Sequence, residues 1–139
     1  MRKLILTLAL VTVINTGFSV SAQNLTDGKV IAYYFHGSFR CRTCNMMEKY
    51  SRQVIENNFK NALDSEKLEF KAINVEESGN EHFVNDYQLY SKALILSLVK
   101  DGKEIQSKNL TKIWQFASNK QRFFDYVTEE ISSLMKELQ

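Results

Sequence analysis

The sequence predicts a single α/β domain with a mixed four-stranded sheet flanked by helices. Three observations predict it. Apolar runs of strand length alternate with amphipathic stretches of helical period, and the resulting element order is β-α-β-α-β-β-α. The 139 residues, 44% of them hydrophobic, are enough for one packed core. A strand, a crossover helix and a further strand imply parallel pairing, whereas a tight hairpin adds an antiparallel edge.

Residues 29–89 are predicted to form a strand, a helix, a second strand and a second helix. Residues 29–35 form a β-branched and aromatic run, typical of a central strand buried on both faces. From residue 41 to about residue 63, apolar positions recur every three to five residues and predict a long amphipathic helix. Residues 67–75 begin with strand-like alternation, and Asn80 can cap a short helix over residues 81–89.

The second half reads as a hairpin followed by helices. Residues 93–99 are a second apolar run, and the Asp-Gly pair at 101–102 is a strong hairpin signal. Residues 110–116 indicate a short helical segment. Ser118 with Gln121 matches a capping box that opens the last helix. The inward stripe of this last helix is expected to comprise Phe123, Phe124, Val127, Ile131, Leu134 and Leu138.

The first 22 residues have the pattern of a secretory signal peptide. Arg2 and Lys3 give a basic start, residues 4–14 are apolar, and small residues lead to Ala22. The apolar run is shorter than the roughly 20 residues of a membrane-spanning helix. We therefore expect a signal peptide at 1–22, a mature domain at 23–139, and no membrane span after cleavage. The expected location is periplasmic or extracellular.

Removal of the expected signal peptide balances the charge of the chain. The full sequence has 18 basic and 16 acidic residues, and Arg2 and Lys3 account for the excess. A neutral mature chain gives no argument for binding nucleic acid. We also expect a monomer.

Both cysteines of the chain lie in one C-x-x-C motif, Cys41-Arg42-Thr43-Cys44, which follows a strand and loop and opens a helix. The thiolate is the form that attacks a disulfide, and a helix N-terminus stabilises an anion. Two cysteines three residues apart can close a disulfide with little motion. Because the first cysteine is normally the more exposed, we assign Cys41 as nucleophile and Cys44 as the resolving cysteine.

The strand–CxxC–helix unit in this element order resembles the thioredoxin-like superfamily, in its minimal glutaredoxin-type form. More narrowly, residues 33–37 and 40–44, with Trp114 before the last helix, are similar to small exported bacterial proteins of the ArsF type. Those proteins are labelled as subunits of a nitrophenyl-compound nitroreductase. The sequence has no flavin or nicotinamide fingerprint, so no cofactor is expected. The resemblance therefore implies an electron-relay or maturation partner.

The chain departs from the thioredoxin pattern in having no proline. The resemblance implies a proline inside the CxxC, where this chain has Arg42 and Thr43. It also implies a cis-proline before the third strand, in a substrate-facing loop, where this chain has Ala93 or Leu94. The missing prolines argue against general protein-disulfide exchange. In place of the buried acid found in many relatives, this chain has Tyr34 or Phe35.

Positive charge is expected around Cys41. Arg40 and Arg42 flank it in sequence, and His36 lies in the preceding loop. Nearby positive charge lowers a thiol pKa, so our hypothesis is a Cys41 thiolate that is largely formed at neutral pH. Glu48 is expected to form a solvated ion pair on the helix, and Trp114 is expected to be a packing residue.

Three functional hypotheses follow from the motif. The first is an exported thiol–disulfide oxidoreductase or electron relay whose partner is another exported protein. The second is a protein that binds Cu(I) or As(III) through Cys41 and Cys44, with His36 as a further ligand. The third is a non-catalytic partner subunit. Zinc is not expected, because a structural zinc site needs four ligands and only His82 remains as the fourth.

Overall fold

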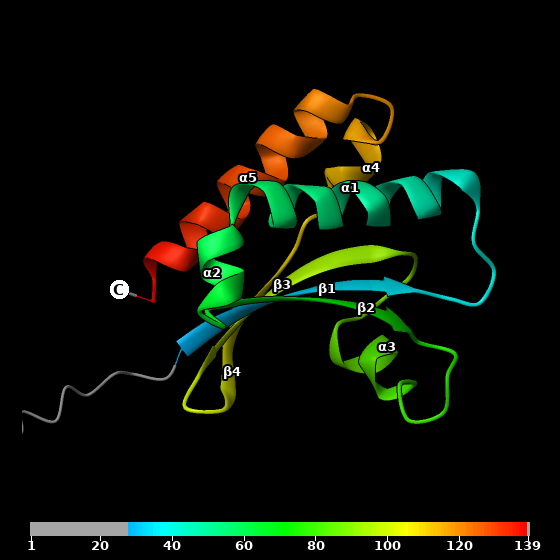
Figure 1. The fold of residues 1–139 in the computed structure, drawn as a ribbon. Helices are drawn as coiled ribbons and strands as arrows, with labels where there is room; N and C mark the ends of the chain where they lie inside the picture. Colours follow the sequence, from blue (N-terminus) through cyan, green and yellow to red (C-terminus); the bar gives the residue numbers. More distant parts are fainter. Residues whose placement is uncertain (1–27, 139) are drawn as a thin grey trace, which may run out of the picture.

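The computed structural model describes residues 28–138 and shows a four-stranded sheet with helices on both faces (Figure 1). The expected signal peptide at residues 1–22 lies outside the described residues. None of the described helices is long and apolar enough to cross a membrane.

The sheet contains one parallel and two antiparallel pairs of neighbouring strands. Its strands are β1 (Gly28–His36), β2 (Leu68–Asn74), β3 (Ala93–Lys100) and β4 (Lys103–Asn109), and their spatial order is β2-β1-β3-β4. β1 pairs with β2 in parallel, whereas the β1–β3 and β3–β4 pairs are antiparallel. This strand order and these pairings are those of the minimal thioredoxin-like fold, so the predicted fold class is confirmed.

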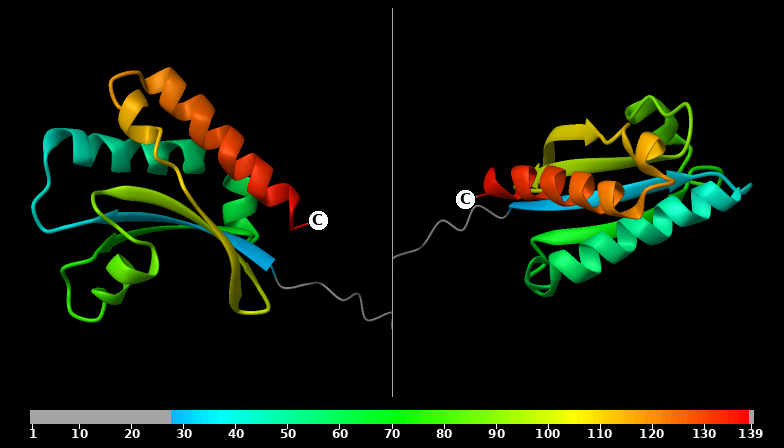
Figure 2. Two further views of the ribbon diagram at one scale, coloured as in Figure 1. Left: turned by 180° about the vertical axis from the view of Figure 1, so that it is seen from behind. Right: turned by 90° about the horizontal axis from the view of Figure 1, so that it is seen from above.

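The helices cover the two faces of the sheet unequally. The two long helices, α1 (Arg42–Asn58) and α5 (Lys120–Lys136), lie on one face, with the short α4 (Ile113–Phe116) beside them (Figure 2). The short α3 (His82–Asp86) lies on the opposite face. This arrangement leaves the beginning of α1 beyond the end of β1, where the CxxC motif lies.

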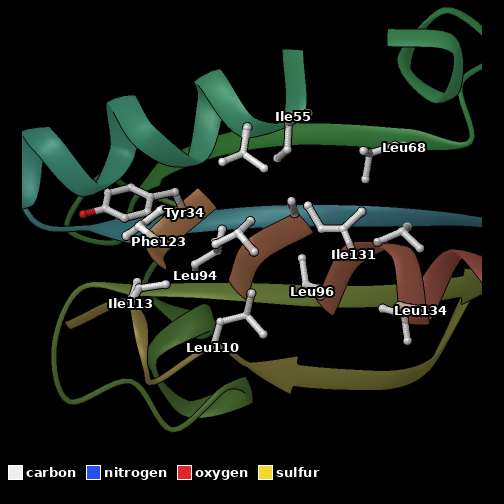
Figure 3. Packing of buried hydrophobic residues seen from close by; sticks show 14 of the residues in the cluster. Tyr34, Ile55, Leu68, Leu94, Leu96, Leu110, Ile113, Phe123, Ile131 and Leu134 are labelled. Atoms are coloured by element: carbon white, nitrogen blue, oxygen red, sulfur yellow. The ribbon is translucent and has the colours of Figure 1, made fainter. Parts of the chain in front are cut away.

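The main core fills the space between the sheet and the two long helices (Figure 3). Alternate residues of the central strands point toward it because side chains alternate between the faces of a strand. The fully buried members include Val30, Ala32 and Tyr34 from β1, Leu94, Leu96 and Leu98 from β3, and Phe123, Val127 and Ile131 from α5. On the other face, a smaller cluster of Phe35, Ala93 and Ile95 packs against α3.

The β3–β4 hairpin turns at the predicted position. Asp101 and Gly102 have φ values of 51° and 73°. Two consecutive positive φ values are typical of the tight hairpin turns that Asp-Gly favours. The predicted antiparallel edge is therefore confirmed.

Three predicted helix boundaries were wrong. The long first helix is interrupted at Phe59, whose φ of −127° is not helical, and continues as the separate α2 (Lys60–Asp64). α3 is shorter than expected, and its N-cap is Glu81, which makes no side-chain cap hydrogen bond. The Asn80 amide donates to the carbonyl of Asn74. The N-cap of α5 is Asn119, which accepts from the Arg122 N–H at 3.0 Å, and not Ser118.

Candidate redox site

The two cysteines form a disulfide at the beginning of α1, with Cα atoms 5.1 Å apart. Cys41 is the N-cap residue, and its sulfur accepts the Cys44 N–H at 3.2 Å. Cys41 is partly exposed, whereas Cys44 is only 1% exposed. A partner could therefore reach the Cys41 sulfur. The buried Cys44 sulfur could break a mixed disulfide between Cys41 and that partner.

Tyr34 lies beneath this first turn of α1. Its side chain is fully buried, and its hydroxyl donates to the Cys44 carbonyl at 2.7 Å. Burial is the main cause that raises the Tyr34 pKa far above its ordinary value, so the phenol stays neutral. The sequence analysis expected Tyr34 or Phe35 in place of a buried acid, but it did not predict the hydrogen bond from the Tyr34 hydroxyl to the Cys44 carbonyl.

The Arg40 side chain is paired and does not face the disulfide as a free charge. Its guanidinium forms an ion pair with Glu48, and Glu48 also lies 3.4 Å from the Arg52 guanidinium. The expected ion pair on the helix is present between Glu48 and Arg52, but the Glu48 side chain is only 16% exposed, so its carboxylate is less solvated than expected. The Nε of Arg40 is buried without a hydrogen-bond acceptor among the described residues. The positive charge expected around Cys41 is therefore partly compensated by Glu48.

The other supporting residues differ in exposure and in hydrogen bonding. Arg42 is exposed on the first turn of α1, and Thr43 is half-buried next to it. His36 ends β1, and its Nδ1–H donates to the Gly37 carbonyl at 3.0 Å. Within residues 28–138, no group of three His, Cys, Asp or Glu side chains could hold a metal ion.

The loop before Cys41 is tied to the segment after β2 by Glu76. The Glu76 carboxylate accepts the backbone N–H of Ser38 at 3.0 Å, and the Asn74 amide donates to the Ser38 hydroxyl. The hydrogen bond from the Ser38 backbone is the main cause that lowers the Glu76 pKa. A Cβ at Gly37 would lie 2.4 Å from a Glu76 oxygen, so a larger residue there would displace the carboxylate. Sequence reasoning missed Glu76, because it is 38 residues from Ser38 and matches no motif.

The beginning of β3 differs from the expected substrate-facing loop. Ala93 and Leu94 are strand residues with exposed fractions of 6% and 0%, so they do not form an exposed loop, and Ala93 lines a small pocket next to the loop before β3. The loop that precedes them contributes Tyr90, whose side chain is 95% exposed. Trp114, expected to be a packing residue, is 41% exposed, and its indole N–H donates to the Lys92 carbonyl at 3.0 Å.

Comparisons with known proteins find similarity among solved structures alone. No family model and no curated protein matches this chain, so the narrower ArsF-type resemblance has no support from them. A structure described as "Structure of a malarial protein" is 16% identical, covers 78% of this chain and 96% of its own, and has a TM-score of 0.43.

Two thioredoxin structures also match. Thioredoxin from Fasciola hepatica is 22% identical over 65% of this chain and 79% of its own, with a TM-score of 0.34. Thioredoxin f2 from Chlamydomonas reinhardtii is 13% identical over 70% of this chain and 84% of its own, with a TM-score of 0.37. The fold assignment rests on the strand order and pairing described above.

Proposed function

We propose that this protein is a thiol–disulfide oxidoreductase that uses the Cys41–Cys44 pair. The observation that carries the proposal is the pairing of a partly exposed Cys41 with a buried Cys44 across the first turn of α1. A disulfide that closes so short a loop adds little stability by restricting the unfolded chain. We therefore assign the disulfide to thiol–disulfide exchange, because it does not cross-link distant parts of the fold.

The proposed exchange proceeds in two balanced steps. A thiolate of a partner dithiol attacks the Cys41 sulfur, the Cys41–Cys44 bond breaks, and Cys44 leaves as a thiolate that takes up a proton. The second partner thiolate then attacks its own mixed-disulfide sulfur and releases the Cys41 thiolate. The partner becomes a disulfide and this protein a dithiol, so two electrons move to this protein. The reverse steps reduce a partner disulfide.

Replacing the resolving cysteine tests the proposed roles. Cys44→Ser should accumulate a mixed disulfide on Cys41, because no second thiol remains to release the bound partner. The matched control is Cys41→Ser, which leaves the buried Cys44 and should trap far less. Mass spectrometry after acid quenching measures both adducts. Equal trapping by the two variants, or none by either, would contradict the assignment.

We propose also that the protein acts outside the cytosol as an electron relay for another exported protein. The pattern of residues 1–22 supports export, and a disulfide persists most readily in an oxidising compartment. The test is expression of the full chain in a bacterium with a periplasm, followed by fractionation and intact-mass measurement. A periplasmic product beginning near Gln23 is expected, whereas an uncleaved cytosolic chain would contradict export.

A further inference from the structure

Three exposed aromatic side chains lie on segments next to the CxxC motif or next to the beginning of β3. Phe39, two residues before Cys41, is 79% exposed, and Tyr90, in the loop before β3, is 95% exposed. Trp114 on α4 is 41% exposed. Clustered exposed aromatic residues mark interaction surfaces more often than chance, because burying them on binding is favourable. This end of the molecule is therefore a candidate contact surface for a partner.

The elements that carry these side chains are neighbours. Tyr34, whose hydroxyl binds the Cys44 carbonyl, is the β-sheet partner of Leu94 near the start of β3. The hydrogen bond from Trp114 to the Lys92 carbonyl ties α4 to the loop just before β3. Both views in Figure 2 place α4 at the same end of the molecule as the beginning of α1. The loop, α4 and the disulfide thus share one edge.

A small pocket lies between the loop before β3 and α4. Its walls include the exposed Tyr90 and Trp114, and the fully buried Leu110 and Ile113 also line it. The volume is about 180 Å³. Sites for whole cofactors or drug-sized ligands measure roughly 300–1,000 Å³. The pocket is therefore of a size for one apolar side chain and not for a cofactor.

The loop also offers main-chain groups to a partner. Within the described residues, the backbone N–H and C=O groups of Tyr90 and Ser91 make no backbone hydrogen bond. Backbone polar groups need partners once water is excluded, and an extended polypeptide supplies donors and acceptors at matching spacing. A protein segment fits this loop better than a small thiol does.

We propose that the pocket between Tyr90 and Trp114 is a specificity subsite for an apolar or aromatic side chain of the partner protein. This side chain lies a few residues from the partner cysteine that reacts with Cys41. The inference rests on the proposed exchange reaction and adds the kind of partner segment that the site selects. Burial of one such side chain is the source of the selectivity.

Peptide exchange kinetics test the subsite. The full chain, reduced at Cys41 and Cys44, is mixed with decapeptides that each carry one cysteine as a disulfide with glutathione. Phenylalanine is placed in turn two or three residues to either side of that cysteine and compared with an all-serine version. The best phenylalanine peptide should react about tenfold faster than the serine peptide, which corresponds to roughly 1.4 kcal/mol.

Three variants locate the preference. Trp114→Ala and Tyr90→Ala should each reduce the phenylalanine-to-serine rate ratio to within about threefold of unity, and Trp114→Phe should retain more of it than Trp114→Ala. The fully exposed Tyr90 keeps the test valid if Trp114→Ala fails to fold. Ile105→Ala is the matched control, because Ile105 is an exposed apolar residue on β4, outside the pocket. It should leave the ratio unchanged.

The outcomes separate the subsite from the reaction. A phenylalanine-to-serine rate ratio near unity in the unmodified protein would overturn the proposed subsite. So would a ratio that is unchanged in both Trp114→Ala and Tyr90→Ala. Neither result would contradict the proposed exchange reaction. Failure to exchange even with glutathione disulfide overturns the proposed function and, with it, the basis of the subsite.

Discussion

Tyr34 supports the beginning of the CxxC helix through a buried, neutral hydroxyl. Its neutral hydroxyl donates to the Cys44 carbonyl, and its raised pKa keeps it protonated across the physiological range. It supports the first turn of α1 without contributing a charge that changes with pH. The two charges that act on the Tyr34 hydroxyl belong to Arg40 and Glu48, which are paired with each other.

Tyr34→Phe should lower the free energy of unfolding by about 1–2 kcal/mol, because the buried Cys44 carbonyl loses its donor. Tyr33→Phe is the matched control, since it makes the same chemical change on the opposite face of β1, where no hydrogen bond to a cysteine is made. Urea unfolding of the oxidised proteins measures both. Equal losses in the two variants would show that the hydrogen bond is not the cause.

Glu48→Gln should shift the titration of Cys41 to lower pH. Without the Glu48 carboxylate, the Arg40 charge is no longer compensated, and positive charge next to a thiol favours the thiolate. The rate of alkylation of the reduced protein as a function of pH measures the midpoint. Glu56→Gln, an exposed substitution further along α1, serves as the control. A midpoint that stays unchanged or rises in Glu48→Gln would rule out this electrostatic link.

At the scale of elements, two tertiary contacts hold the edge that carries the disulfide. Glu76 ties the loop before Cys41 to the segment after β2, and Trp114 ties α4 to the loop before β3. Both contacts join segments far apart in sequence. Each connects a loop at this edge to another element of the fold.

The Glu76 contact predicts a pH dependence of the loop. Its pKa is lower in the folded protein than in the unfolded chain, so the stabilisation is fully present above the ordinary glutamate range. It is lost as the pH falls through the lowered folded pKa. The Ser38 amide resonance should follow this transition by NMR, and Glu76→Gln should abolish it. If the neighbouring Glu77→Gln abolishes it equally, Glu76 is not the group responsible.

The N-cap of α5 gives a prediction about helix stability. Asn119→Ala should cost about 1 kcal/mol of the free energy of unfolding, because the Arg122 N–H loses its acceptor. Ser118→Ala, which changes the cap expected from sequence, should cost much less. Thermal unfolding of the two variants side by side measures the difference. A larger loss for Ser118→Ala would restore the capping box predicted from sequence.

At the scale of the whole molecule, the sequence was sufficient for the architecture. β1 and β3 read as unbroken apolar runs because both faces of these strands are covered, and the Asp-Gly turn marked the hairpin. The CxxC at a helix start followed from the same local pattern. These features depend on residues that are close in sequence. Hydrophobic periodicity and turn residues can therefore predict them.

The features that sequence did not predict depend on contacts between distant segments. The ion pair of Arg40 with Glu48, the hydrogen bond of Glu76 to Ser38, and the exposure of Trp114 each follow from how elements pack. The interruption of the first helix at Phe59 also escaped prediction, since the apolar spacing continues through it. Local propensity yields to tertiary packing at such places.

The proposed function depends on a reversible dithiol–disulfide couple at Cys41 and Cys44. The most direct measurement is equilibration of the protein in glutathione buffers of graded ratio, followed by acid quenching, thiol trapping and intact-mass analysis. We predict one two-electron transition between the disulfide and the doubly trapped dithiol, reached from both the oxidised and the reduced protein. A pair that stays a disulfide at every glutathione ratio, or that once reduced does not re-form, would contradict the proposed exchange.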